Sequence, residues 1–381
     1  MKKKYILFIS ILIILILILI LIYNSFFAVK RVKVLLTGDA LINKNILDFN
    51  YNEKSSSYDF KKMIRYVKEY NKNYDLKFYN QESPISGSQF KYRGSICFNT
   101  PSQFGLDMIN AGFNMVSLAN NHTFDGELGM INDELYCFKS ELGVINSLDF
   151  WHKNDNVYIS GSYYNEEDRD KIVIKKKNGI TYTLLSYTTF INIPEGYEES
   201  PYLVNIYDEE QVKKDILKVR DKVDVIFVSM HWGYDNEESV VASTEQKEKA
   251  QYLASLGVDV VIGHHPYVIQ PIEYIGKTLV FYSLGRLVSD LPISSNNYAT
   301  QIGLLSSVLI EKKNRKVSVK NTNNELVYTY INEDNKNTLV VPFSKMNSKY
   351  NKNYVKLYED YRKIVKMYDN NIYVNSLKGS N

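Results

Sequence analysis

Acidic, amide and imidazole side chains recur at one kind of position in this 381-residue sequence, directly after a run of apolar and β-branched residues. The residues that share this position are Asp39, Glu82, Asn121, His122, His231, His264 and His265. They include four of the five histidines of the chain. Carboxylates mixed with imidazoles suit a divalent ion such as Mn, Zn or Fe, because oxygen ligands supply charge and imidazole nitrogens supply affinity. The pattern therefore predicts a metal site.

The chemistry expected of such a site follows from its donors. A carboxylate such as Glu82, placed between two ions, would bridge them. Ions held in this way polarise a phosphoryl oxygen and generate hydroxide near neutral pH. We therefore expect hydrolysis or transfer at a phosphoester.

Several of these residues have a simpler interpretation when taken one at a time. Asp39 and Asn121 suit turns, and His231 fits a buried histidine whose hydrogen bonds are satisfied. The occurrence of all of them at strand ends favours a shared site. His152 lies outside the pattern, in a polar stretch, and is expected to be a solvated surface residue.

An alternation of predicted strands and helices positions these groups. Strands are expected at residues 32–36, 76–79, 115–118, 172–174, 181–187, 223–230, 258–262, 268–274, 279–283 and 303–310. Helices are expected at residues 58–70, 102–111, 128–141 and 244–256. This order predicts an α/β layered sandwich. Because strand ends in such a sheet share one rim, we expect the polar groups to converge on one crevice.

The N-terminus has a different pattern. Residues 5–22 form an almost unbroken run of Ile and Leu without a charge, long enough to span a bilayer as a helix. Lys2, Lys3 and Lys4 precede the run, so the positive-inside bias predicts a single-pass protein of the cell membrane, with its N-terminus in the cytoplasm and its globular part extracellular. A cleaved signal peptide is the alternative, but residues 25–28 fit a cleavage site poorly. We therefore expect residues 1–29 to be a transmembrane anchor in the lipid bilayer.

Composition narrows the remaining classes of function. A formal net charge of +3 gives no reason to expect a nucleic acid partner. Two cysteines, Cys97 and Cys137, are too few for a disulfide scaffold or a zinc ribbon, and their pairing stays open. The predicted site falls within a domain of residues 30–311. Residues 312–381 are expected to form a polar C-terminal extension with a strand at 326–331 and a helix at 350–368.

The loops that contain the polar groups resemble those of a known family. The matching stretches are Thr37-Gly38-Asp39, Asn80-Gln81-Glu82-Ser83-Pro84-Ile85, Ser117-Leu118-Ala119-Asn120-Asn121-His122-Thr123 with Asp125-Gly126, Met230-His231-Trp232-Gly233 and Val260-Val261-Ile262-Gly263-His264-His265-Pro266. Further matches continue through residues 268–285. In this order they resemble the CapA family of capsule synthesis proteins, also known as the PgsA type of poly-γ-glutamate biosynthesis proteins, which has a calcineurin-like metallophosphoesterase fold.

The resemblance implies a layered β-sandwich flanked by helices, placed outside the cytoplasm behind a membrane anchor. It also implies a role in making or attaching an anionic surface polymer. If the protein is an accessory subunit of a polymer synthase, membrane-embedded synthase subunits are the expected partners. By analogy with related phosphoesterases, the metal ligands would be Asp39, Glu82, Asn121, His231 and His264. His122 would be the catalytic general acid, and His265 a further metal ligand or a substrate contact.

Three positions depart from these patterns. Phosphoesterases of this fold usually open with Asp-x-His, whereas the second residue after Asp39 is Leu41. Capsule-family members commonly have a basic residue and a Gly soon after the Gly-Asp, where this chain has Asn43 and Lys44. The usual second His after the His-His-Pro is Tyr267. The first and third departures remove ligands, so the number of bound ions, one or two, stays open.

Four functions are compatible with these observations. One of them is a purely structural surface protein with a degenerate site, which would bind no metal; the other three are as follows. The first is a CapA-type role in the production of capsule or poly-γ-glutamate, with a metal-dependent phosphoesterase-like site. The second is an extracellular metallohydrolase that acts on another phosphoester or on the polymer itself. The third is a non-catalytic accessory subunit of a polymer synthase, because a fold does not fix its function and polymer synthesis needs ATP, which is found inside the cell.

Overall fold

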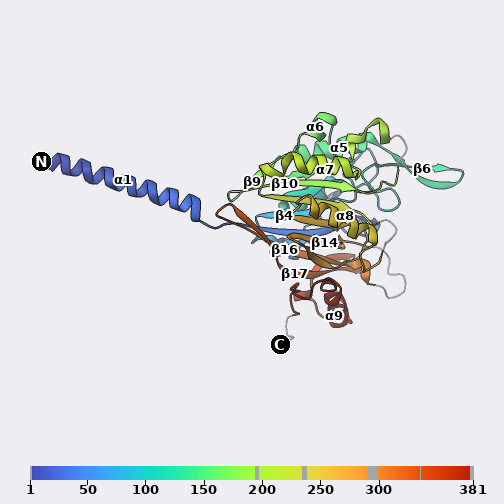
Figure 1. The fold of residues 1–381 in the computed structure, drawn as a ribbon. Helices are drawn as coiled ribbons and strands as arrows, with labels where there is room; N and C mark the ends of the chain where they lie inside the picture. Colours follow the sequence, from blue (N-terminus) through green and yellow to red (C-terminus); the bar gives the residue numbers. More distant parts are fainter. Residues whose placement is uncertain (1, 194–196, 234–237, 291–297, 335, 378–381) are drawn as a thin grey trace.

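Two β-sheets form the centre of the protein and share a core between their facing sides (Figure 1). The computed structural model describes residues 2–193, 197–233, 238–290, 298–334 and 336–377. The first sheet has the strand order β18-β17-β16-β1-β4-β5-β8, with β15 pairing to β1 as well. The second sheet has the order β13-β14-β12-β11-β10-β9.

The first sheet is built around β1 (Lys30–Ala40), which runs antiparallel to β16 (Ile302–Lys313) and parallel to β4 (Leu76–Asn80). Its other strands are β5 (Met115–Ser117), β8 (Tyr158–Ser160), β15 (Arg286–Val288), β17 (Lys316–Asn332) and β18 (Asn337–Pro342). Both β17 and β18 continue the sheet antiparallel from β16. The sequence after Lys313 therefore adds strands to the same sheet that contains β1.

The second sheet has a parallel centre. Its parallel strands are β10 (Ile180–Thr188), β11 (Val225–His231), β12 (Val260–His264) and β14 (Thr278–Phe281). Antiparallel strands lie at its edges, namely β9 (Lys175–Lys177) beside β10 and β13 (Ile272–Ile275) beside β14.

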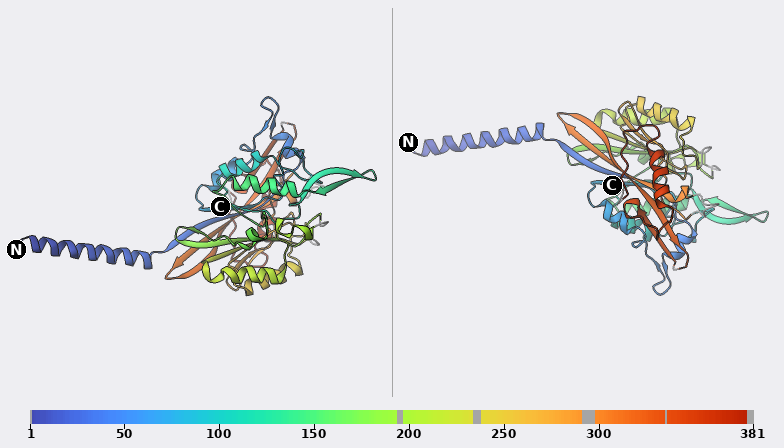
Figure 2. Two further views of the ribbon diagram at one scale, coloured as in Figure 1. Left: turned by 90° about the horizontal axis from the view of Figure 1, so that it is seen from above. Right: turned by 90° about the horizontal axis from the view of Figure 1, so that it is seen from below.

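Helices cover the outer faces of the two sheets, as Figure 2 shows. The first sheet is covered by α3 (Arg65–Asn71), α4 (Ser102–Asn110) and α5 (Glu141–His152), and the second by α7 (Glu209–Val219) and α8 (Thr244–Ser255). The C-terminal α9 (Tyr354–Val365) packs against the core between the sheets. Smaller elements are α2 (Lys44–Phe49), α6 (Glu166–Asp170) and the pair β2 (Tyr51–Asn52) and β3 (Ser57–Tyr58). The helix predicted over residues 58–70 begins only at Arg65, because residues 61–64 form turns.

The sequence of β1 explains the layers. Val34 and Leu36 contribute to the core between the sheets, whereas Leu35 packs with the helices on the outer face. Successive side chains of a strand point to opposite faces, so an unbroken apolar run is buried on both sides. The order helix, sheet, sheet, helix confirms the predicted α/β layered sandwich.

The parallel strands end at one rim. Asp39 and Asn80 are register partners in the first sheet, and His231 and His264 are register partners in the second. The polar residues that follow the strands therefore start from neighbouring backbone positions.

Residues 125–139 form a hairpin, and the helix predicted over residues 128–141 is wrong. The hairpin consists of β6 (Asp125–Ile131) and β7 (Glu134–Lys139), joined by Asn132 and Asp133. Both turn residues have positive φ values, 49° and 64°, which a tight two-residue turn requires and which Asn and Asp tolerate. The turn chemistry outweighed the helical spacing, and α5 begins only after Ser140, whose side chain caps it.

The chain enters the first sheet from α1 (Lys2–Phe27), which projects away from the globular part (Figure 1). In Figure 2 the hairpin β6–β7 projects from the opposite end of the molecule. Within the described residues, no helix has the length and hydropathy that a membrane crossing requires, so the span predicted at residues 5–22 is not confirmed.

Candidate metal centre

All seven predicted residues are buried at the rim where the strands end. The rim carries Asp39 at the end of β1, Glu82 after β4, Asn121 and His122 after β5, His231 at the end of β11, and His264 and His265 at the end of β12. Six of these residues separate into two groups that make different contacts, and His122 lies apart from both groups.

The first group, which we call the His231 half, consists of Glu82, Asn121, His231 and His265. The ligand atoms of Glu82, His231 and His265 all lie within 4.8 Å of one another. The Nε2 atom of His231 lies 2.8 Å from Asn121 Oδ1 and 3.8 Å from Glu82 Oε1. Two imidazole nitrogens, a carboxylate and an amide oxygen are the donors that Mn, Zn or Fe accept. The His231 half therefore fits one divalent ion.

His231 is held in the form that binds metal ions. Burial, together with the neighbouring His265, His264 and His122, lowers the pKa of His231 well below its usual value. The imidazole is therefore neutral near pH 7, as metal coordination requires.

His265 reaches this group through an unusual backbone conformation. Its φ is 94°, in a region that costs free energy for any residue other than glycine and that clusters at functional sites. The centres of the His231 and His265 rings are 4.9 Å apart. The structure thus brings His265, rather than its neighbour His264, together with Glu82 and His231.

The second group, which we call the Asp39 half, consists of Asp39, His264 and Arg286. Asp39 Oδ1 lies 2.9 Å from His264 Nδ1 and accepts a hydrogen bond from Asn80 Nδ2 at 2.8 Å. Its Oδ2 accepts from the backbone N–H of His265 at 3.2 Å. Burial alone would raise the pKa of Asp39, but the charge interaction with His264 and these hydrogen bonds outweigh burial, so the pKa lies below its usual value. Asp39 is therefore an ionised carboxylate at neutral pH, and both of its oxygens contact groups of the protein.

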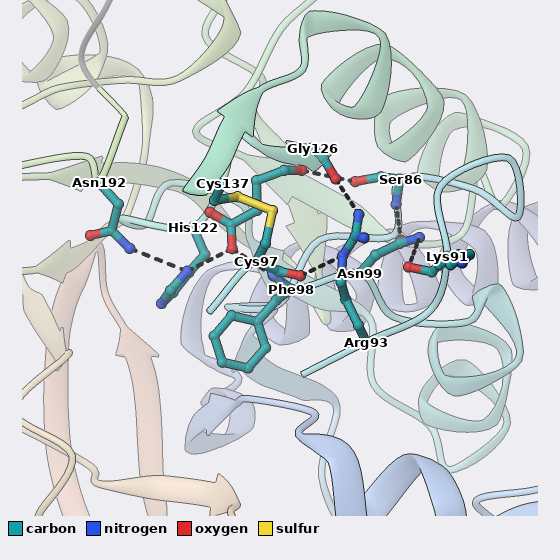
Figure 3. Close-up of a disulfide and its surroundings, with 11 residues drawn as sticks. Ser86, Lys91, Arg93, Cys97, Phe98, Asn99, His122, Gly126, Cys137 and Asn192 are labelled. Carbon is teal, nitrogen blue, oxygen red and sulfur yellow. Dashed lines mark hydrogen bonds and ion pairs between the residues drawn. A yellow bond between two sulfur atoms is a disulfide. The ribbon is translucent and has the colours of Figure 1, made fainter. Parts of the chain in front are cut away.

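His122 is oriented by a carboxylate that the sequence analysis missed. Its Nδ1 lies 2.9 Å from Asp125 Oδ2 and 3.3 Å from Asn192 Nδ2 (Figure 3). The ring of Phe98 packs edge-on against the imidazole, with 4.6 Å between centres. A histidine whose Nδ1 is paired with a carboxylate has its Nε2 left for proton transfer.

A disulfide joins Cys97 to Cys137 next to this pair, with 5.1 Å between the Cα atoms (Figure 3). It ties β7 of the hairpin to the loop before Phe98. The same two cysteines lie near Asp125 in a group with metal-ligand spacing, but sulfurs bonded to each other do not ligate an ion.

Sequence signals existed for some of the missed residues. Asp125 follows His122 by three positions, and Arg286 directly follows the strand-ending stretch Ser283-Leu284-Gly285. Asn192 lies in a loop without any such signal. His152 is exposed, as expected of a surface residue, and its ring stacks on Tyr164.

Solved structures and curated relatives resemble the chain. The structure of the calcineurin-like phosphoesterase YfkN from Bacillus subtilis superposes on this chain with a TM-score of 0.44 and 14% sequence identity. The match covers 88% of this chain and 98% of the YfkN chain. The capsule biosynthesis protein CapA of Bacillus anthracis is 27% identical over 272 residues, which are 68% of this chain and 60% of the relative. The PGA biosynthesis protein CapA of Bacillus subtilis is 30% identical over 181 residues, 47% of this chain and 43% of the relative. The matches thus span less than two thirds of the length of each relative.

The family assignment rests on sequence. The model of the bacterial capsule synthesis protein family PGA_cap matches residues 33–291, a range that includes both halves of the rim and His122. The chain therefore belongs to the PGA_cap family of bacterial capsule synthesis proteins.

Proposed function

We propose that this protein is a membrane-anchored, extracytoplasmic CapA-like protein that acts in capsule or poly-γ-glutamate production through a metal-dependent phosphoesterase-like site. The supporting observation is the His231 half, where a carboxylate, an amide and two imidazoles gather in a buried position. Burying such groups side by side is costly in an apolar core. A bound cation would offset that cost.

Each residue has a task in this proposal. Glu82, Asn121, His231 and His265 would hold the divalent ion, which when bound supplies Lewis acidity toward a phosphoryl oxygen. Asp125 holds the imidazole of His122 through Nδ1. His122 Nε2 then donates a proton to the leaving oxygen as general acid.

The anchor is proposed from the sequence of residues 5–22 and from the course of β1. Only Ala28 and Val29 separate α1 from β1, and Asp39 lies near the other end of that strand. An extended chain of the 11 residues of β1 rises by roughly 35 Å. With α1 in the bilayer, the rim would therefore face away from the membrane.

The position of the rim relative to α1 suggests which substrates and partners the protein meets, and the disulfide suggests its compartment. A rim remote from the bilayer suits an anionic polymer or a soluble phosphoester better than a lipid headgroup, and membrane-embedded synthase subunits would meet the end of the body near α1. The disulfide between Cys97 and Cys137 supports an oxidising compartment outside the cytoplasm.

Metal content of the full chain, purified in mild detergent, tests the proposal. We expect bound Mn, Zn or Fe in the parent, loss of that metal in a His231→Ala, His265→Ala double variant, and retention in the surface control His152→Ala. Hydrolysis of p-nitrophenyl phosphate should follow the metal. No metal above background after incubation with these ions would overturn the proposal.

Carbonate extraction and protease accessibility from outside the cell test the anchor and its orientation.

A second candidate is a non-catalytic accessory role in polymer assembly. The observation that favours it is hairpin β6–β7, which exposes apolar side chains beyond the rim, namely Met130, Ile131, Leu135, Tyr136 and Phe138. Exposed apolar surface of this kind marks contact sites. Under this candidate, a Met130→Ser, Leu135→Ser variant keeps its metal but lowers polymer yield in cells. Unchanged yield would count against it.

A further inference from the structure

Arg286 has no role in the proposed function, although it lies inside the site. It begins β15 and is the register partner of Asp39 on β1. The backbone N–H of Asp39 donates to the Gly285 carbonyl at 3.0 Å, and a Cβ on Gly38 would lie only 1.8 Å from that same oxygen. This close approach, which only a glycine permits, fixes Arg286 beside Asp39.

The guanidinium group of Arg286 is buried with few partners. The residue is 1% exposed. A guanidinium has five N–H donors, yet within the described part of the chain Arg286 donates a single hydrogen bond, from Nη1 to Ser289 Oγ at 3.2 Å, and its Nε is buried without a partner. Its Cζ lies 3.9 Å from the centre of the Tyr267 ring. A charge buried in this way is costly unless opposite charges surround it.

The opposite charges belong to the carboxylates of the rim. Glu82, Asp39 and Asp290 all interact electrostatically with Arg286. Burial lowers the pKa of Arg286, and these carboxylates oppose that change. Because a guanidinium stays protonated in proteins, a permanent positive charge lies beside the carboxylates of both halves.

The Asp39 carboxylate has little capacity left for a metal ion. Its Oδ1 faces His264 and Asn80, and its Oδ2 accepts from the backbone of His265. Leu41, two positions further on, is a buried apolar residue that offers no ligand. Tyr267 packs its ring against the guanidinium. Two of the three departures noted in the sequence, Leu41 and Tyr267, therefore lie in the same half of the site as Arg286.

We propose that Arg286 supplies the positive charge of the Asp39 half in place of a second metal ion, so that the site binds one divalent ion, on the His231 half, and presents the guanidinium to a phosphoryl group of the substrate. This inference rests on the proposed function, since it concerns the same site. The planar fork of an arginine matches phosphoryl oxygens in a bidentate manner. The N–H groups of Arg286 for which the described residues offer no hydrogen-bond partner would provide the donors.

Stoichiometry of Mn²⁺ binding to the full chain tests the charge replacement. We expect one equivalent and an electron paramagnetic resonance spectrum of isolated Mn²⁺. Two equivalents with an exchange-coupled spectrum would overturn the inference and leave the proposed function intact. Absence of binding would overturn the proposed function, and this inference with it.

Binding of inorganic phosphate to the Mn²⁺-loaded protein, followed by calorimetry, tests the anion contact. Arg286→Met removes the charge at similar length and should weaken phosphate binding at least about tenfold while one equivalent of Mn²⁺ is retained. Arg286→Lys keeps the charge without the fork and should weaken it about threefold, which preserves the test if the Met variant does not fold. Unchanged phosphate affinity in a folded variant that binds one Mn²⁺ would overturn the inference.

Discussion

The His231 half and the Asp39 half each place a buried carboxylate beside imidazoles, but the surroundings of the two carboxylates differ. Asp39 is engaged by His264, by the Asn80 amide and by a backbone N–H, and a buried arginine lies next to it. Glu82 lies among the ligand atoms of His231 and His265. The same residue types thus build a close carboxylate–imidazole contact beside an arginine in one half and a cluster of potential ligand atoms in the other. The neighbours of a carboxylate, more than its own type, decide its role.

The largest expected effect separates the halves by stability. Asp39→Ala leaves His264 and Asn80 without their buried partner and removes one of the carboxylates that face Arg286, so we expect a loss of about 3–5 kcal/mol in the free energy of unfolding of the metal-free protein. Glu82→Ala should cost less than about half of that, since the low pKa of the neighbouring His231 keeps this imidazole neutral, so it loses no charge partner. Urea unfolding checks both variants. Equal losses of stability in the two variants would contradict the proposed difference between the two carboxylates.

The pH dependence of the Asp39 contribution has a defined sign. Because the folded-state pKa of Asp39 lies below its usual value of 3.8, the stability that it contributes is present above about pH 4 and is lost as the pH falls further. Asp39→Ala should therefore flatten the acid limb of the stability curve.

For metal affinity we expect the opposite: variants in the His231 half should have a larger effect than variants in the Asp39 half. His231→Ala removes a ligand and should weaken Mn²⁺ binding at least about 100-fold, which is close to 3 kcal/mol. His264→Ala, in the other half, should change that affinity by less than about tenfold. Calorimetric titration of the two variants, with His152→Ala as a surface control, measures the contrast. A larger effect at His264 would reverse the assignment of the halves.

Asp290, one of the carboxylates that interact with Arg286, should make the stability of the protein depend on pH. Burial raises the pKa of Asp290 from 3.8 to about 6, although Arg286 and the backbone N–H groups of Asn45 and Ile46 act against this. The folded state therefore holds this proton more tightly, and stability should fall as the pH rises from about 4 to about 6. Asp290→Asn should remove up to about 3 kcal/mol of this decline, measured as the difference in unfolding free energy between pH 4 and pH 7. Parallel curves for parent and variant would contradict it.

The smallest effect concerns the general acid beside the His231 half. Asp125→Asn keeps the side-chain shape but removes the charge that orients His122, so turnover of p-nitrophenyl phosphate should drop about tenfold with metal content unchanged. Asp133→Asn, at the tip of the hairpin, is the matched control and should have no effect. Turnover of the Asp125 variant equal to that of the parent would contradict the role of Asp125 in orienting His122.

Much of the fold follows from sequence because its strands are buried on both faces. An unbroken apolar run such as Val34 to Leu36 has no other stable place than the middle of a layered sheet. Hairpin β6–β7 was missed for the opposite reason. Its apolar residues are exposed, so their spacing says little about helix or strand, and the Asn132-Asp133 turn with its disulfide decides the conformation.

The sequence by itself determined which residues stand at the rim, since each follows an apolar run that must become a buried strand. Only the tertiary structure decided how they associate. His264 and His265 are neighbours in the chain, yet one pairs with Asp39 and the other joins Glu82 and His231. Arg286 reaches Asp39 through a strand pairing between residues far apart in sequence. Such partners are fixed by register and by close backbone approach, which depend on the packing of whole strands and leave no mark in the local pattern of residues.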